Sequence, residues 1–409
     1  MIAACRGVHL RGLSVVAGRF GAVTIEPTSP PPHVAAAPVS EWGSAPVLPE
    51  AAVSRIAQAV STSRAEGTRR TYASAWRRFE AWCTTRGHTP LPAHPVTVAA
   101  YLVDAADTYD LVGERAYAPM TLARWVSAIG HHHRIAGHPT PHTHDLVRST
   151  LSGIRRDYAS SGDRPRSPRA PLLVDDVVTI VRSARQAVTG WAAEVHERRD
   201  SALLLMGFAG AFRRSELVAL TCGDVTVHRL DGVHVRLRRS KTDQEGTGTV
   251  RALPFTTHHH SCPPCAYVRW AQVVAAFEIA GSPGVIRLLR TAPPFAGHVC
   301  RAALPRMRAR APLFRAIAKN GNLSDAALSG ASVHAAIRRR AQAAGYDENV
   351  VAQLGGHSLR AGFVTQAFRN GADAHAIMRQ TGHTTPAMVE LYAREHAPLV
   401  GNAVTEIGL

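Results

Sequence analysis

The 409-residue sequence has few of the residues that mark secreted or membrane-spanning proteins. Its 6 cysteines are too few for a disulfide-stapled scaffold, so a reducing compartment, the cytoplasm, is the expected setting. The longest apolar run, from Ala202 to Phe212, is too short to cross a membrane. Arginines interrupt the apolar residues near the N-terminus, so we expect neither a signal peptide nor a membrane partner.

Acidic residues are also scarce relative to basic ones. The chain has 30 Asp and Glu residues against 47 Lys and Arg residues, and its formal net charge is +17. Such an excess predicts a polyanionic partner, most often nucleic acid. Charge alone leaves one alternative open, which is a genome rich in G and C that uses arginine codons freely.

The composition changes along the chain divide it into four predicted regions. The first is a tail rich in Ala, Pro, Val and Ser, which we expect to be disordered or the product of an over-long start-codon assignment. The second is helical, because apolar residues such as Tyr72, Trp76 and Phe79 recur at i, i+4 and i+7. A basic linker rich in Pro, Ser and Arg precedes the last region. The regions are 1–48, 49–158, 159–171 and 172–409.

The last region mixes helices with a few strands. Helical patterns cover about 173–187 and 194–209, and the sequence then changes to alternating apolar residues from Val225 to Leu237. Asp231-Gly232 is typical of a hairpin turn, and a third strand is predicted at 249–255. The fold class predicted for the chain is therefore mainly α with a small antiparallel β-sheet.

Six residues could carry chemistry, although each has an ordinary structural interpretation. Arg213 follows a Gly-Ala break, and Glu216 can pair with it, as at many helix starts. Lys241 lies at a hairpin tip, where a lysine is usually only solvated. His357 and Arg360 are three residues apart, which puts both donors on one helix face. His383 follows a glycine that ends a helix, and Tyr392 lies on the next helix, where it could equally be a core residue.

Taken together and in this order, these residues resemble the tyrosine recombinases, also called the phage integrase family. That family uses Arg, Lys, His-x-x-Arg, His or Trp, and Tyr, which correspond here to Arg213, Lys241, His357 with Arg360, His383 and Tyr392. Glu216 matches the family's acidic residue beside the first arginine. The helical region is similar to the family's core-binding domain, so the resemblance covers nearly all of residues 50–400.

The resemblance implies a two-domain clamp around double-stranded DNA. A helical, SAM-like core-binding domain would face an α+β, integrase-type catalytic domain across the duplex, and four protomers would assemble on the DNA. Type IB topoisomerases share part of the residue set on a different layout. We expect seven arginines to contact DNA, from the helical region, the linker and the hairpin: Arg69, Arg70, Arg77, Arg134, Arg164, Arg166 and Arg239.

The resemblance also implies a mechanism. Arg213 and Arg360 would bracket a phosphodiester, with His383 as a further donor. Tyr392, whose unperturbed pKa is about 10, would attack after His357 removes its proton, and Lys241 would protonate the leaving 5′-oxygen. The product would be a 3′-phosphotyrosine intermediate, and the reaction would need neither metal nor ATP.

Two stretches do not follow from the resemblance. Residues 281–312 form a longer and more basic segment than we expect, either an inserted loop that touches DNA or a poorly ordered excursion. Cys262 and Cys265 have metal-like spacing, but Cys300 stands alone, and a Cys-Pro at this helix start is often structural in the family. We therefore predict no metal and no cofactor.

Two alternatives to a recombinase remain open at this point. A non-catalytic DNA-binding protein could use the same fold, although the complete residue set argues against it. A topoisomerase-like enzyme would only relax supercoils, and the helical region with the short C-terminal tail favours the recombinase.

Overall fold

The structure, a computed structural model, describes residues 13–17, 23–27, 48–163, 169–238, 248–405 and 407. The internal contacts of the chain divide it into two compact units, Met1–Arg78 and Phe79–Leu409, and the boundary between them falls within a helix. Within the expected tail, the described residues form one antiparallel strand pair, β1 (Leu13–Ala17) with β2 (Val23–Pro27). The rest of that prediction lies outside the described residues.

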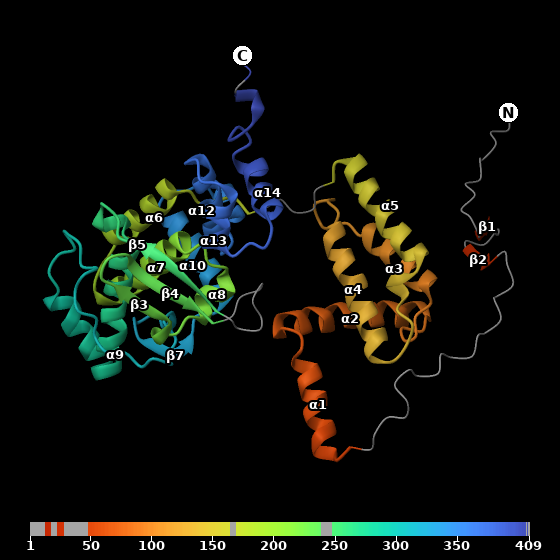
Figure 1. Ribbon diagram of the computed structural model, residues 1–409, viewed down its shortest axis with the longest axis horizontal. Coiled ribbons are helices and arrows are strands. Elements are labelled where there is room, and N and C mark those ends of the chain that lie inside the picture. Colours follow the sequence, from red (N-terminus) through yellow and green to blue (C-terminus); the bar gives the residue numbers. More distant parts are fainter. Residues whose placement is uncertain are drawn as a thin grey trace. The chain divides into compact units, whose positions relative to one another are not determined.

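Five α-helices occupy residues 48–163, the region in which the sequence predicts helices (Figure 1). They are α1 (Glu50–Thr62), α2 (Glu66–Arg86), α3 (Pro95–Ala106), α4 (Pro119–Ile135) and α5 (Asp145–Ser161). Prolines open α3 and α4, where a missing N–H costs nothing. Phe79 of α2, Tyr101 of α3 and Trp125 of α4 are buried, and the Tyr101 ring lies 5.2 Å from Phe79 and 5.7 Å from Trp125. Aromatic residues thus form the centre of this helical core.

The remaining described chain is α+β, and most of its core surrounds α7. Its helices are α6 (Val174–Gln186), α7 (Trp191–Ala209), α8 (Arg214–Ala219), α9 (Pro263–Thr291), α10 (Gly330–Ala343), α11 (Glu348–Gln353), α12 (Ser358–Arg369), α13 (Ala374–Thr381) and α14 (Pro386–His396). Its strands are β3 (Val225–His228), β4 (Gly232–Leu237), β5 (Thr249–Pro254), β6 (Arg315–Ile317) and β7 (Leu323–Ala327). Short 3-10 turns cover Pro141–Thr143, Cys222–Asp224, His259–Ser261 and Ala403–Thr405.

The strands pair as antiparallel sheets. β4 lies between β3 and β5, with Val235 opposite both Val225 and Arg251. Val233 and Val235 of β4 are fully buried, and Leu237 nearly so. The mainly α fold with small antiparallel sheets is therefore confirmed, whereas the predicted domain limits remain a prediction.

Two carboxylates on α7 are buried and ion-paired. Glu197 accepts hydrogen bonds from Arg269 (3.0 Å) and Arg185 (3.2 Å). Asp200 accepts from Arg199 (2.7 Å) and Arg340 (2.8 Å). Burial alone would raise the pKa of Glu197, but the Arg269 guanidinium offsets this and holds the pKa below its usual value. These pairs link α7 to α6, α9 and α10.

Helix α9 is the one helix in the described chain that is long and apolar enough to cross a membrane. Non-helical backbone at Ala280 and Gly281 divides it, and its first half packs in the core around the fully buried Trp270. A core helix of a soluble protein can have the same length and apolar composition, so α9 gives no reason to place the chain in a membrane. The segment 281–312, predicted as an inserted loop or an excursion, is helical as far as Thr291, as the second half of α9, and it packs through the buried Val285 and Cys300.

Candidate active site

A backbone turn between α7 and α8 forms the floor of the site. Gly210 ends α7, and Ala211 adopts φ of 47°, the left-handed region that side chains disfavour. A Cβ on Gly210 would lie 2.2 Å from the Phe212 ring, so glycine is required there for space. The turn directs the carbonyl oxygens of both residues toward buried arginines.

Arg213 follows this turn and precedes α8. Its side chain donates to Glu216 Oε1 at 2.7 Å, and its backbone N–H donates to Glu216 Oε2 at 2.9 Å. Glu216 therefore caps α8 and fixes the guanidinium at the same time. The predicted Arg213–Glu216 pair is present.

Arg251 of β5 is a third partner that the sequence did not single out. It is buried, lies 3.3 Å from Glu216 Oε2, and donates to the carbonyl oxygens of Gly210 (2.8 Å) and Thr381 (3.1 Å). The only signal in the sequence is an arginine on the inward face of a strand, two residues before the fully buried Leu253. Burying an arginine side chain costs free energy unless its charge is paired, so a partner for Arg251 was to be expected.

Arg360, on the first turn of α12, is 1% exposed. It donates to the Ala211 carbonyl (2.8 Å) and the Thr381 carbonyl (2.7 Å), and its other amino group contacts His383 Nε2 at 2.8 Å. Burial is the main cause, and the charge of Arg213 the next, of a pKa for Arg360 that is lowered to about 10. The guanidinium is still charged at neutral pH, and carbonyl oxygens rather than a carboxylate hold it.

The hydrogen bonds around His383 assign its tautomer. Thr381 donates its hydroxyl proton to the Ile377 carbonyl, so its oxygen accepts from His383 Nδ1 at 2.9 Å. Nε2 then carries the lone pair that accepts from Arg360. The pKa of His383 is lowered to about 3, mainly by burial and next by the charge of Arg360. A neutral His383 orients Arg360.

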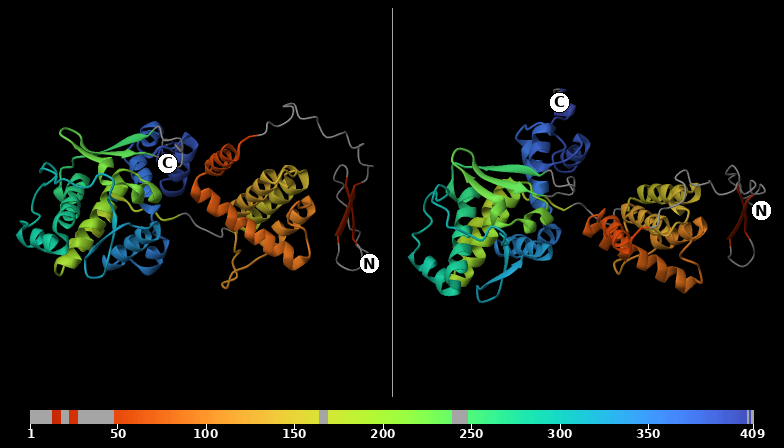
Figure 2. Two further views of the ribbon diagram at one scale, coloured as in Figure 1. Left: turned by 90° about the horizontal axis from the view of Figure 1, so that it is seen from below. Right: turned by 60° about the horizontal axis from the view of Figure 1, so that its bottom comes forward.

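His357 and Tyr392 meet at the open side of this cluster. The Tyr392 hydroxyl lies 2.7 Å from His357 Nε2. The Tyr392 ring centre lies 6.0 Å from the His357 ring and 5.9 Å from the His383 ring. His357 precedes α12, His383 follows α13 and Tyr392 lies on α14; in both views of Figure 2 these three helices lie together in blue, and all three are in contact.

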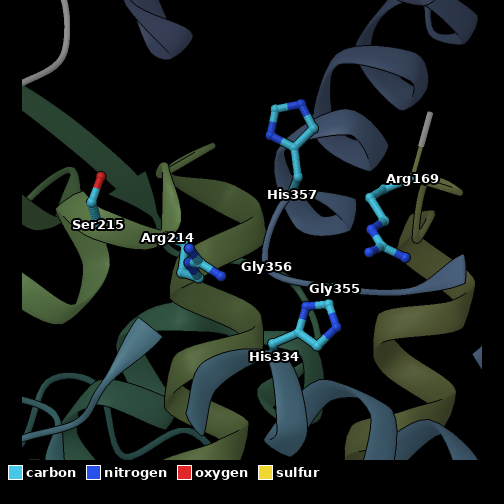
Figure 3. A pocket seen from close by; sticks show the side chains of 7 residues that line it. All are labelled: Arg169, Arg214, Ser215, His334, Gly355, Gly356 and His357. Carbon is cyan, nitrogen blue, oxygen red and sulfur yellow. The ribbon is translucent and has the colours of Figure 1, made fainter. Parts of the chain in front are cut away.

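A pocket of about 370 Å³ opens beside His357 (Figure 3). Its lining comprises Arg169, Arg214, Ser215, His334, Gly355, Gly356 and His357. A Cβ on Gly356 would lie 2.9 Å from the Arg214 side chain, and one on Gly355 would lie 2.5 Å from the His334 ring. The two glycines keep the pocket open, and its arginines suit an anion.

The remaining predicted residues fall into two groups. Arg69, Arg70 and Arg77 on α2 are exposed, as is Arg134 on the last turn of α4, and Arg70 forms only an exposed pair with Glu66 (3.5 Å). The second group lies outside the described residues and comprises Lys241, Arg164, Arg166 and Arg239. The structure thus brings together Arg213, Glu216, Arg360, His383, His357 and Tyr392.

The chain is similar to proteins of known name. A sequence profile of the phage integrase family matches residues 322–397, which include His357, Arg360, His383 and Tyr392. An integrase/recombinase of Selenomonas ruminantium, named a XerD homolog, is 31% identical over 348 residues, covering 84% of this chain and 86% of that relative. The tyrosine recombinase XerD of Xanthomonas campestris pv. campestris is 26% identical over 289 residues, covering 69% of this chain and 71% of the relative.

Among solved structures, one similar chain is the integrase of transposon Tn1549 in complex with transposon right-end DNA. It is 15% identical, with a TM-score of 0.49, and the match covers 85% of this chain and 98% of that chain.

Proposed function

Because the chain belongs to the phage integrase family of tyrosine recombinases, we propose that Tyr392 is its nucleophile and that Arg213 and Arg360 hold the phosphate that is attacked. The chain is a DNA-binding strand-exchange enzyme and acts in site-specific recombination. One observation carries the residue assignment. The Tyr392 hydroxyl lies 2.7 Å from an imidazole nitrogen, beside a cluster of arginines.

The arginine cluster has charge to spare for an anion. Arg213 and Arg251 contact Glu216, whereas Arg360 contacts carbonyl oxygens and a neutral imidazole. Three guanidiniums against this carboxylate leave positive charge that a phosphodiester would neutralise. Cleavage concentrates negative charge on the non-bridging oxygens, and fixed donors of this kind contribute about 3 kcal/mol each in the transition state.

The proposed cleavage step balances as follows. Tyr392 Oη bonds to phosphorus as its proton passes to His357 Nε2, and the bond from phosphorus to the 5′-oxygen breaks. Lys241 protonates that oxygen, leaving a 3′-phosphotyrosine and a free 5′-hydroxyl. Attack by another 5′-hydroxyl reverses these transfers, so rejoining conserves the bond energy and needs no ATP. The guanidiniums supply the charge that a metal ion would otherwise provide, so the chemistry is metal-independent.

His383 has a different role in this proposal from the one its position in the sequence suggests. With Nε2 accepting from Arg360 and Nδ1 donating to Thr381, both ring nitrogens are engaged. His383 is therefore a positioning residue that holds Arg360 toward the phosphate. The same holds for Arg251, which fixes Glu216 and the turn at Gly210.

DNA contacts outside the cleaved phosphate are assigned to exposed cations. We infer that the arginines of α2 and the basic linker follow the duplex backbone, and that the pocket beside Arg214 receives a neighbouring phosphate. The helical region 49–158 and region 172–409 would act as the two halves of a clamp. Strand exchange involves four cleavages, so a homotetramer on DNA in the cytoplasm is the proposed working form.

The test is covalent trapping. The protein is incubated with duplexes from the DNA flanking its own gene, nicked so that the 5′-hydroxyl fragment escapes, with EDTA present only during the reaction. A denaturing gel should show a protein–DNA band for wild type and for Tyr109→Phe, an exposed control tyrosine, and none for Tyr392→Phe. A band in Tyr392→Phe would contradict the nucleophile assignment.

The same assay separates the alternatives. Retarded DNA on a native gel without any covalent band would indicate a non-catalytic DNA-binding protein. Relaxation of supercoiled plasmids of any sequence, without exchange between sites, would indicate a topoisomerase-like activity.

A further inference from the structure

Three cysteines and a histidine meet at the start of α9, away from the arginine cluster. Cys262 caps the N-terminus of α9 and Cys265 lies in its first turn. His298 and Cys300 come from the segment that follows the same helix. The three sulfur atoms and one ring nitrogen all lie within 4.8 Å of one another.

The spacing of these atoms fits a single tetrahedral ion. His298 Nδ1 lies 3.4 Å from Cys265 Sγ and 3.7 Å from Cys300 Sγ. Bonds of about 2.3 Å to sulfur and about 2.0 Å to nitrogen at tetrahedral angles place sulfur and nitrogen about 3.5 Å apart. The two distances from His298 Nδ1 are therefore close to the separation that a zinc ion would require.

The surroundings of the four side chains also match those of metal ligands. His298 Nε2 lies 3.2 Å from the Thr257 carbonyl, the contact that fixes a ring so that Nδ1 faces a metal. The Val299 N–H donates to Cys265 Sγ at 3.4 Å, which stabilises a thiolate. The three sulfurs are buried, with Phe255, Phe295 and Val299 packed against them. The site is thus closed to solvent on its sulfur side.

We propose that Cys262, Cys265, His298 and Cys300 bind one structural Zn²⁺ ion. Three thiolates and one imidazole form a closed, soft ligand set, the kind that zinc occupies in structural sites. No position is left for water, so the ion would not take part in DNA cleavage. The inference is independent of the proposed function.

A zinc site would explain how the unexpected segment after α9 is held. The ion would join residues at the start of the helix to residues about 33 positions later, across the whole length of α9. Residues 292–300 would then be fixed against the end of β5 through Thr257 and Phe255. Metal binding would contribute directly to the stability of this part of the fold.

The first measurement is the metal content of the purified full-length chain, by elemental mass spectrometry after expression with added zinc. Wild type should hold about one zinc per chain. His298→Ala is the main variant because His298 is exposed and its loss leaves the buried packing intact. Its zinc affinity should fall by at least about tenfold, and His298→Cys should restore it by completing a four-cysteine site.

Matched variants distinguish ligands from neighbouring residues of the same type. Cys265→Ser should lose the zinc, whereas Cys222→Ser, at a buried cysteine outside the cluster, should keep it. His260→Ala should behave as wild type. Cobalt substitution of the wild type should give the visible spectrum of a tetrahedral site with thiolate charge-transfer bands.

Two outcomes would overturn the proposal. One is a wild type that is folded and supplied with zinc but holds no stoichiometric metal, and in which Cys262, Cys265 and Cys300 react with a thiol reagent. The other is a disulfide between two of the cysteines in protein purified under reducing conditions, which peptide mass spectrometry would detect. Neither result would bear on Tyr392, whose role is tested by covalent trapping.

Discussion

Two buried groups of arginines in this protein are neutralised in different ways. On α7, the carboxylates Glu197 and Asp200 each accept hydrogen bonds from at least two guanidiniums, and both are nearly or fully inaccessible to solvent. Around Arg360, carbonyl oxygens and a neutral histidine take the place of most carboxylates. In the first arrangement every guanidinium donates to a carboxylate, and these ion pairs stabilise the fold. The second orients its charges without cancelling them, which prepares the site for an anion.

Exchanging an arginine for lysine in each group should give the sharpest contrast. Arg360→Lys removes the planar guanidinium that donates to the Ala211 and Thr381 carbonyl oxygens and, in the proposed mechanism, to the phosphate, so the cleavage rate should fall by about 10²–10³. Arg340→Lys, at the Asp200 group, should leave cleavage within a few-fold of wild type. Single-turnover rates of covalent-complex formation measure both. Equal losses in the two variants would remove the distinction between the groups.

Neutralising one carboxylate in each group tests the converse. Glu197→Gln leaves Arg185 and Arg269 buried without a counter-charge, so the free energy of unfolding should fall by about 3 kcal/mol or more. Glu216→Gln also removes the counter-charge of the buried Arg251, so it should lower stability as well, but unlike Glu197→Gln it should reduce cleavage per folded molecule because it frees Arg213. Urea unfolding followed by fluorescence gives the first quantity, and trapping at fixed folded-protein concentration gives the second.

The acid sensitivity of His383 sharpens the comparison further. Its pKa, lowered to about 3 mainly by burial, lies below the unfolded value of about 6.5, so the unfolded state binds the proton first. Stability from this residue is complete above about pH 6.5 and is lost as pH falls toward 3. At pH 4.5, wild type should therefore lose about 2 kcal/mol more, relative to pH 7, than His383→Gln does. Nitrogen-15 NMR of the imidazole should show a neutral ring with the proton on Nδ1 at pH 5.

The smallest effect is expected for an exposed arginine, which belongs to neither group. Arg77→Ala should weaken DNA binding equally for all sequences and reduce the slope of log affinity against log salt by about 1. Glu80→Gln, one turn further along α2, serves as a control for surface charge. An unchanged salt slope in Arg77→Ala would remove α2 from the proposed DNA surface.

The sequence predicted the parts of the site that local spacing determines. His357 and Arg360 lie three residues apart at a helix start, and Arg213 and Glu216 form a local pair, so the chain needs no tertiary information to bring them together. Arg251 escaped prediction because its role depends on β5 lying against the turn at Gly210. The sequence shows a strand arginine but not what it meets.

The cysteine cluster escaped prediction for the same physical reason. The spacing of Cys262 and Cys265 indicates half of the proposed ligand set, whereas Cys300 and His298 reach them only because the chain reverses after α9. The strands β3, β4 and β5 were placed correctly since their alternation and the Asp231-Gly232 turn are local signals. Contacts between segments distant in sequence therefore set the limit of what could be foreseen.

The left-handed backbone at Ala211 has a consequence for how this sequence can drift over generations. A methyl side chain in that conformation costs about 1 kcal/mol, and the Ala211 carbonyl is held by Arg251 and Arg360. Glycine is the substitution that relieves this cost without moving the carbonyl, whereas valine, isoleucine and threonine are sterically barred. Among descendants of this gene, position 211 should admit small residues alone, although its own side chain is a buried methyl group without polar atoms.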